Sequence, residues 1–382
     1  MNEDFNRLRL IRSSHIGPVR FRQLIDRYGS ATKAVQALPD LAKTGGAKAP
    51  RLAAKDLITQ EREQVDALGG GYLYRDGPGY PALLKELHNA PAAIIYKGDL
   101  SLLDSPAVAI VGARNASAAA CRFARNLAHD LTAEGVTVIS GLARGIDTAA
   151  HQGALKGGTV AVIAGGIDIY YPPENKDLQN DIGQSNLLIA EHPPGTEPTA
   201  RHFPYRNRII AGLARATIIV EAAPKSGSLI TARLAAEAGR HVMAVPGSPL
   251  DPRSQGCNGL IREGAILVQT AEDILEQIRH FDDRAELAVV EEQSVAAHHS
   301  RSIPVSDSMS SISNAEGSAK ERVENDDIRT ELVNMLSMTP IKIDDLLRQS
   351  NIPISTAQMI LVELELEGQL ARHSGGRVSL PS

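Results

Sequence analysis

Tryptophan is absent from this chain of 382 residues, and there are only two cysteines, Cys121 and Cys257. Two cysteines far apart in sequence exclude a disulfide framework and a cysteine-rich metal site, and they are typical of a reducing compartment. No segment approaches the ~18 consecutive apolar residues of a membrane-spanning helix, and the polar N-terminal residues lack the apolar core of a signal peptide. We therefore expect a cytoplasmic protein with no membrane partner.

A large excess of one charge is also missing, because the formal net charge is only −5. Any site for a polyanion must therefore be a local cationic patch. Aromatic residues make up only 3% of the chain, which leaves few flat side chains for stacking on a planar ligand. The hydrophobic content of 43% is ordinary for globular domains, and the length allows two or three of them.

Composition divides the chain into four parts. Residues 1–68 have apolar side chains at helical spacing and a turn at Gly17-Pro18, which predicts a helical domain, either helix-hairpin-helix (SAM-like) or a plain bundle. Residues 69–280 contain the main domain and its lead-in segment, and residues 281–324, rich in Ser, Glu, Asp and His, predict a flexible linker. Residues 325–382 predict three helices and a two-stranded hairpin, the pattern of a winged helix.

The main domain alternates apolar strands with amphipathic helices. The predicted strands are the runs at 92–99, 107–112, 136–140, 159–166, 186–191, 216–222 and 241–247. Continuous apolar runs of this kind indicate strands that are buried on both faces. We therefore predict an α/β domain with a Rossmann-like, doubly wound, mostly parallel sheet. Ligands of such sheets bind outside the carboxyl ends of the strands.

Turns that combine glycine with cationic residues follow several of these strands. Helices that begin at such turns present free N–H groups to anions, and arginine forks match phosphate oxygens. We expect the guanidinium groups of Arg114, Arg206 and Arg208 to converge at one rim of the sheet, where a sugar–phosphate backbone can lie across them. The turns are Val111–Ser117, Ser140–His151, Arg201–Glu221 and Lys225–Ala232.

No catalytic constellation appears in the sequence. Asp147 and His151 lie one helical turn apart, and we interpret this pair as structural. Cys257 lies in a glycine-rich loop, where we expect an inert thiol. The chain has no HExxH, GxSxG or GxGxxG pattern and no Walker spacing. We therefore predict no catalytic residue, no metal site and no cofactor.

Five stretches, taken together and in this order, resemble the DNA-processing protein A (DprA/Smf) family. The predicted helical and winged-helix domains on either side also match the layout of the longer members of that family. The stretches are VGARNAS, SGLARGIDTAAH, GGIDIYYPPEN, FPYRNRIIAGLARATIIVEAAPKSGSLITARLA and GRHVMAVPGSPLDPRSQGCNGLIREGA.

The resemblance implies a non-enzymatic protein that binds and protects incoming single-stranded DNA, and that loads the RecA recombinase onto it during natural transformation. It also implies a homodimer formed through the α/β domain. Arg114 would be the leading phosphate contact, Phe203 with the 206–208 run the second, and Lys225 a third. Ala113 stands where many relatives have Ser or Thr, so we expect one hydroxyl contact fewer. The full set of candidate nucleic-acid-binding residues is Gly112, Arg114, Ser117, Ser140, Gly141, Arg144, Gly145, Arg201, Phe203, Arg206, Asn207, Arg208, Lys225, Ser226 and Gly227.

Two functions other than single-stranded DNA binding are also compatible with the sequence. The sheet also resembles that of lysine-decarboxylase-like phosphoribohydrolases, which cleave nucleoside monophosphates, but residues 223–239 have no glutamate at the place of their catalytic carboxylate. Alternatively, the arginines only bridge the subunits of a scaffold, which predicts no oligonucleotide binding. In the winged helix, Glu363, Glu365 and Glu367 would repel phosphates, so we expect this domain to contact proteins or to have an auxiliary role. Arg372 and Arg377 on the wing leave a weak DNA contact open.

Overall fold

In a computed structural model, the chain forms two compact units, each of which is described by itself. The first comprises residues 1–16, 24–53 and 301–382, and the second comprises residues 17–23 and 54–300. Apart from Phe281, the linker predicted at 281–324 lies outside the described residues. The structure describes residues 3–44, 50–279, 281, 332, 341–343, 346–347, 354–366, 369–373 and 377–379.

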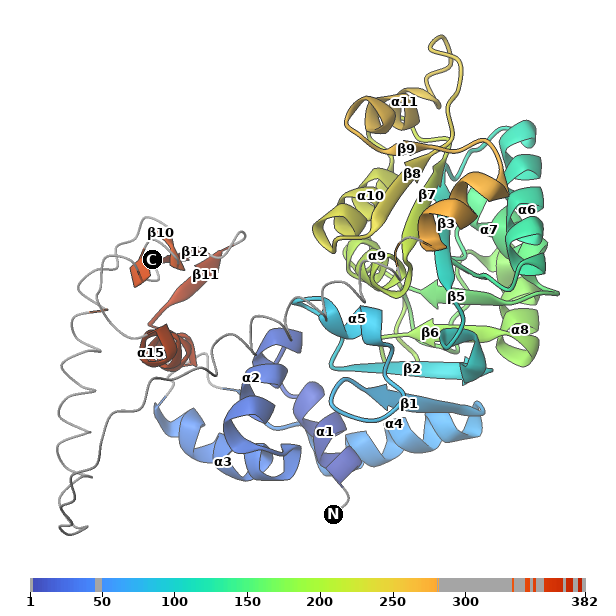
Figure 1. Ribbon diagram of the computed structural model, residues 1–382. Helices are drawn as coiled ribbons and strands as arrows, with labels where there is room; N and C mark the ends of the chain where they lie inside the picture. The colour runs from blue at the N-terminus through green and yellow to red at the C-terminus, as the bar shows by residue number, and fades with distance from the viewer. Residues whose placement is uncertain are drawn as a thin grey trace, which may run out of the picture. The chain divides into compact units, whose positions relative to one another are not determined.

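A nine-stranded sheet forms the centre of the second unit (Figure 1). Its strand order is β1-β2-β6-β5-β4-β3-β7-β8-β9. The pairs β1–β2 and β2–β6 are antiparallel, and all the other pairs are parallel. The doubly wound, mostly parallel sheet predicted from the sequence is therefore confirmed. The strands are β1 (Gly70–Tyr74), β2 (Ala93–Gly98), β3 (Ala107–Gly112), β4 (Thr137–Ser140), β5 (Thr159–Ile163), β6 (Leu187–Ala190), β7 (Ala216–Val220), β8 (His241–Ala244) and β9 (Ile266–Leu267).

Helices cover both faces of this sheet, because the central strands bury apolar side chains on both sides. On one face α6 (Ala118–Ala133), α7 (Ile146–Ala154) and the helical segment 271–279 pack on side chains such as Ile110 and Ile218. On the other face α9 (His202–Leu213) and α10 (Gly227–Glu237) pack on Val111, Ile139 and their neighbours. The unit also contains α5 (Ala82–Glu86), η2 (Leu100–Leu103), η3 (Pro173–Asn175), α8 (Lys176–Ser185) and α11 (Gln255–Arg262).

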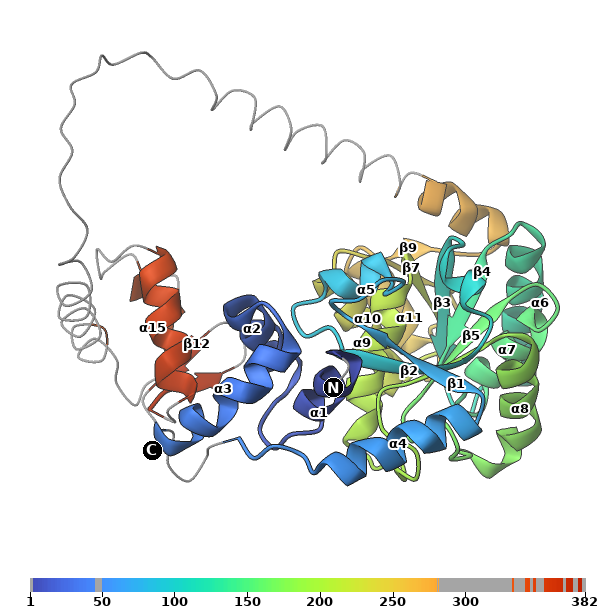
Figure 2. The ribbon, with the colours of Figure 1, turned by 90° about the horizontal axis from the view of Figure 1, so that it is seen from below.

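The helix α4 (Lys55–Ala67) runs beside β1 at the antiparallel end of the sheet (Figure 2). Its buried Val65 packs with Ile95 of β2 and with Ile182 of α8. By its contacts α4 therefore belongs with the sheet.

The winding direction of the sheet reverses at β3. The chain leaves β3 through α6 towards β4, β5 and β6, and it returns to form β7 on the opposite side of β3. Loops that leave the strands on the two sides of such a reversal diverge and open a crevice at the carboxyl ends. The fold therefore places its main crevice above β3 and β7.

The first unit contains α1 (Glu3–Ile11), which packs against α3 (Ala31–Thr44). The carboxylate of Glu3 accepts the N–H of Ala31 at 2.6 Å and thereby satisfies a free donor at the start of α3. The intervening helix α2 (Pro18–Tyr28) follows the Gly17-Pro18 turn, as the apolar spacing predicts, and the two compact units divide within it.

The C-terminal part of the first unit contains α15 (Ile354–Leu366) and a small antiparallel sheet in the order β10-β12-β11. Leu361 and Leu364 of α15 pack with Val378 of β12 in a separate apolar cluster. The predicted hairpin is confirmed, and a third strand extends it. Those strands are β10 (Ile341–Lys342), β11 (Ala371–His373) and β12 (Arg377–Ser379).

Within the described ranges, none of the helices combines the length and the apolar character needed to cross a bilayer.

The burial of His151 in α7 predicts that the stability of the second unit is sensitive to acid. Its Nδ1 lies 2.8 Å from the hydroxyl of Thr159, and that hydroxyl donates to the carbonyl of Val138. Burial, together with the nearby cation of Arg206, lowers the pKa of His151 from 6.5 to about 3. The imidazole therefore stays neutral in the folded protein.

We expect the free energy of unfolding to fall as the pH drops from 6.5 towards about 3, by up to about 1.4 kcal/mol per pH unit. The stabilisation is complete above pH 6.5, because the imidazole is then neutral in both the folded and the unfolded chain. Urea unfolding of the wild type and of His151→Gln between pH 4.5 and 7.5 measures this slope. The exposed His129→Gln is the control. An equally steep slope in His151→Gln would contradict the assignment.

Candidate functional site

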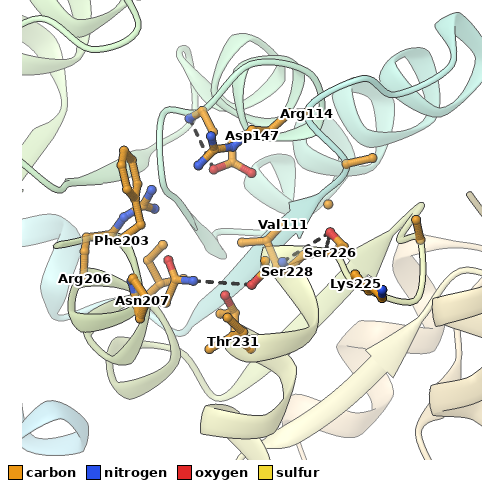
Figure 3. Close-up of a pocket in the computed structure, with 18 of the residues that line it drawn as sticks. Val111, Arg114, Asp147, Phe203, Arg206, Asn207, Lys225, Ser226, Ser228 and Thr231 are labelled. Carbon is orange, nitrogen blue, oxygen red and sulfur yellow. Dashed lines mark hydrogen bonds between the residues drawn. The ribbon is translucent and has the colours of Figure 1, made fainter. Parts of the chain in front are cut away.

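A pocket of about 790 Å³ lies at the carboxyl ends of β3 and β7, at the reversal of the sheet (Figure 3). Its walls come from the turn after β3, the start of α9 and the turn that leads into α10. Figure 3 shows Arg114 and Asp147 on one side of it and Lys225 with Ser226 on another. Of the predicted residues, the pocket is lined by Gly112, Arg114, Phe203, Arg206, Asn207, Lys225, Ser226 and Gly227.

Arg114 is the exposed cation of this pocket. Its guanidinium carbon lies 5.0 Å from the centre of the Phe203 ring. A cation–π contact at an exposed site contributes only about 0.5–1 kcal/mol. No ion pair of Arg114 is formed within the described part of the chain, so its N–H groups can donate to a ligand. The two side chains were predicted as separate ligand contacts, and the structure brings them together in one pocket.

Arg206 is buried at the base of the pocket, where it faces Asp147. The carboxylate of Asp147 accepts the backbone N–H groups of Gly141 at 3.1 Å and Ala143 at 3.3 Å. Burial raises the pKa of Asp147, although the Arg206 cation opposes that rise. Burial lowers the pKa of Arg206 to about 10, so it remains a cation at neutral pH.

Gly141 supports Arg206 and is not itself exposed to a ligand. A Cβ at position 141 would lie 1.4 Å from Nη1 of Arg206, so only glycine leaves room for the guanidinium. The neighbouring Ser140 is fully buried, and its hydroxyl donates to the carbonyl of Ile110 at 2.7 Å. The expectation that these two residues contact a backbone phosphate is wrong, because neither presents a free donor to the pocket.

Arg208 does not join Arg114 and Arg206 in the pocket. Its buried guanidinium donates to both carboxylate oxygens of Glu191, at 2.6 and 2.7 Å. Residues two apart on a helix point in different directions, so α9 cannot present both arginines to one ligand. The prediction that three guanidinium groups converge is therefore wrong for Arg208, which forms an internal ion pair with Glu191. Arg114 and Arg206 do line the same pocket.

Ser117 anchors the Arg114 turn instead of binding a ligand. Its N–H and its hydroxyl donate to the two carboxylate oxygens of Glu221, at 2.8 and 2.6 Å. Its hydroxyl oxygen also accepts the N–H of Ala120 and caps α6. Glu221, whose φ is 51°, follows β7, so this contact fixes the turn after β3 to the end of β7. A phosphate at Ser117 would meet the carboxylate of Glu221.

Three other candidates lie beside the pocket. Arg144 forms an exposed ion pair with Glu174. Gly145 precedes α7 with φ 76°, and a Cβ there would lie 2.3 Å from the carbonyl oxygen of Ala113, so glycine allows the turns after β3 and β4 to approach. Arg201 is exposed at the start of α9 but does not line the pocket.

The start of α10 gives the pocket a second polar wall. The hydroxyl of Ser226 accepts the N–H of Ser228, and Gly227 begins the helix beside open space. Lys225 is exposed immediately before it, and the Asn207 amide bridges to the carbonyl of Gly227 at 3.5 Å. Free N–H groups, a positive helix end and a lysine together favour an anion.

The polar and aromatic lining residues that the sequence interpretation did not name as site residues include Asn115, Tyr171 and Arg253. Tyr171 is 45% exposed, and its ring centre lies 5.5 Å from that of Phe203. The stretch GGIDIYYPPEN, used only for the family resemblance, was the available signal for it. Arg253 pairs with Asp251 at 2.8 Å at the pocket wall.

Cys257 lies outside the pocket. The prediction that it lies in a loop is wrong, because it lies in a helix. The glycine-rich stretch around it forms α11, and the side chain is fully buried. Burial raises the pKa of Cys257 to about 11, so the thiol stays protonated. Within the described ranges, no group of three His, Cys, Asp or Glu side chains is placed to hold a metal ion.

The balance of charge in the pocket favours an anionic ligand. Arg114, Arg206, Lys225 and Arg253 line it, against the single carboxylate of Asp147. Asp147 is satisfied by backbone donors below the surface. The exposed charged groups of the pocket are therefore cationic, and the rings of Phe203 and Tyr171 lie beside them, which suits a chain of phosphates that also carries planar groups.

Replacing Arg208 by Met should destabilise the protein, because Glu191 is left unpaired. Breaking a buried pair costs about 3–5 kcal/mol, and we expect the lower end because the Glu191 side chain keeps 21% exposure. Urea unfolding measures the loss. Arg233→Met is the control, because the Arg233–Glu237 pair is exposed and should contribute less than about 1 kcal/mol. Equal losses in the two variants would contradict this account of Arg208.

Comparison with known families gives three matches that cover most of the chain. The profile described as DNA recombination-mediator protein A matches residues 71–279. A DprA-like N-terminal HHH domain matches residues 1–63, and a DprA winged helix domain matches residues 316–376. The predicted layout of helical domain, sheet domain and winged helix is thereby confirmed.

Individual relatives agree with these matches. The DNA processing protein DprA of Streptococcus pneumoniae is 49% identical over 200 residues, which cover 52% of this chain and 71% of the relative. The DNA processing protein DprA of Bacillus subtilis is 44% identical over 202 residues, covering 52% of this chain and 68% of the relative.

Two solved structures are also similar. The X-ray structure of DprA from Streptococcus pneumoniae superposes with a TM-score of 0.57 and 39% identity, covering 68% of this chain and 98% of that one. DprA from Helicobacter pylori, solved to study its single-stranded DNA binding mode, gives a TM-score of 0.51 and 29% identity, covering 55% of this chain and 96% of that one. The chain therefore belongs to the DNA recombination-mediator protein A family, also called the DprA/Smf family.

Proposed function

We propose that this protein binds single-stranded DNA in the pocket above β3 and β7. The observation that carries the proposal is the exposed guanidinium of Arg114, held over Phe203 in a pocket that also receives the start of α10. Arginine and helix N–H groups bind phosphates of any sequence, and the aromatic ring offers a face to any base. The Helicobacter pylori relative described by its single-stranded DNA binding mode supports the same ligand.

The proposed contact set is smaller than the one predicted from the sequence. Arg114 and Lys225 are the exposed phosphate contacts, and Gly227 offers backbone N–H at the start of α10. Phe203 contacts a base, and Arg206 supplies positive charge from below. The other lining candidates, Gly112, Asn207 and Ser226, shape the pocket and keep the α10 turn in place.

We further propose, from family membership, that the bound strand is protected and passed to the RecA recombinase during natural transformation. The protein would act in the cytoplasm as a homodimer formed through the sheet domain. As family membership implies, it would act without catalysis. A phosphoribohydrolase reaction is not favoured, since residues 223–239 have no glutamate at the place of the catalytic carboxylate of that enzyme class.

Replacing Arg114 by Ala should weaken single-strand binding by about 10- to 100-fold, because one charged hydrogen-bonding group contributes about 1.5–3 kcal/mol. The slope of log affinity against log salt should fall by about 0.7 for each phosphate that the arginine neutralises. Fluorescence anisotropy with labelled oligo-dT at several salt concentrations measures both quantities.

Arg125→Ala is the matched control for this experiment. Arg125 is an exposed arginine on α6 that bonds to Gln152 and does not line the pocket, so the same charge change should leave affinity within about twofold. Unchanged binding by Arg114→Ala would exclude the proposed pocket. RecA-dependent ATP hydrolysis on coated single strands should be stimulated by the wild type and by Arg125→Ala but not by Arg114→Ala.

Replacing Phe203 by Leu should weaken binding about fivefold to tenfold, because the change removes both a stacking face and the support of the Arg114 guanidinium. Phe203→Tyr should bind like the wild type. The salt slope should stay the same in both variants, because neither change removes a phosphate contact. A reduced slope in Phe203→Leu would mean that the ring acts mainly by holding Arg114.

A further inference from the structure

A side pocket of about 260 Å³ adjoins the main pocket beyond Arg114. Arg114, Asn115, Ala143 and Tyr171 line both cavities, so the two spaces share a wall. The side pocket could hold several water molecules, each of which takes up about 30 Å³ in the liquid. It is lined by Arg114, Asn115, Ala143, Arg144, Tyr171, Pro172 and Pro173.

The charge at the edge of the side pocket disfavours a second phosphate there. Arg144, its second cation, pairs with Glu174. Both side chains are well exposed, at 60% and 59%. A phosphate would be attracted by Arg144 and repelled by the adjacent Glu174 carboxylate. A neutral group meets no such repulsion.

The remaining side chains suit a planar, partly polar group. Tyr171 presents an aromatic ring, and Pro172 and Pro173 present apolar surface. Asn115 is exposed, and its amide offers both a donor and an acceptor. An aromatic face beside an amide is the combination that recognises single-stranded bases, by stacking and by hydrogen bonds to the base edge.

We propose that the side pocket is a nucleobase subsite, in which Tyr171 stacks on a base and Asn115 contacts its edge. This inference rests on the proposed function, because the base belongs to a nucleotide whose phosphate lies on Arg114. Because Arg114 lines both cavities, the subsite adjoins the proposed phosphate position. Tyr171 and Phe203, in contact at 5.5 Å, form two adjoining aromatic walls that separate neighbouring bases.

The experiment compares two ligands of equal charge, oligo-dT and an abasic strand of the same length, by fluorescence anisotropy at fixed salt. Tyr171→Leu should weaken binding of oligo-dT about fivefold or more and leave binding of the abasic strand within twofold of the wild type. Tyr171→Phe should retain wild-type affinity for both. Asn115→Ala should weaken binding of oligo-dT at least twofold and leave binding of the abasic strand unchanged.

Tyr170→Leu is the matched control. Tyr170 is the adjacent tyrosine, 38% exposed, and it contacts Asn180 and Lys176 outside both pockets. It should leave binding of both strands unchanged. Equal weakening of both strands by Tyr171→Leu, or no weakening of either, overturns the subsite while leaving the backbone site intact. Failure of the wild-type protein to bind either strand overturns the proposed function itself.

Discussion

Because the chain pairs β7 with the side of β3 opposite to β4, the loops leaving β3 and β7 diverge, and the pocket occupies the space between them. The two strand ends approach closely at Gly112, where a Cβ would lie 1.9 Å from the carbonyl oxygen of Val220. The N–H and the hydroxyl of Ser117 donate to the carboxylate of Glu221 and thereby connect the two loops. The two exposed phosphate contacts proposed here depend on this junction, since Arg114 lies on one loop and Lys225 on the other.

The arginines around this junction have different physical roles. Arg208 is buried with Glu191 and stabilises the join between α9 and the end of β6. Arg206 is also buried, but it lines the pocket, packs against Gly141 and balances the negative charge of Asp147. Arg114 alone of these keeps its guanidinium in solvent beside the ring of Phe203. The two buried arginines thus set the shape and the electrostatic potential of the rim, and the exposed Arg114 can contact a ligand.

A chain with few aromatic residues still brings two of them together at this rim. Tyr171 follows β5 in sequence and Phe203 lies on α9, yet their rings are in contact beside Arg114. A backbone site that accepts any sequence needs cations, and a place for the bases needs flat surfaces. The structure supplies both within one pair of adjoining pockets, which agrees with the family's role in DNA processing.

The central strands and the helices between them were determined by the sequence alone, because apolar runs at 107–112, 159–166 and 216–222 must be buried on both faces. The short strands β1 and β9 and the helix α11 were not predicted. The position of the proposed site followed from the same pattern, and Arg114 and Phe203 could be named as candidates from the family motifs. Sequence spacing could not show that Arg208 faces Glu191, because Glu191 reaches it from another element, or that Ser117 is held by Glu221 across 104 positions. Whether a cation binds a ligand or an internal carboxylate depends on which acid the fold places beside it, and only the tertiary structure decided that.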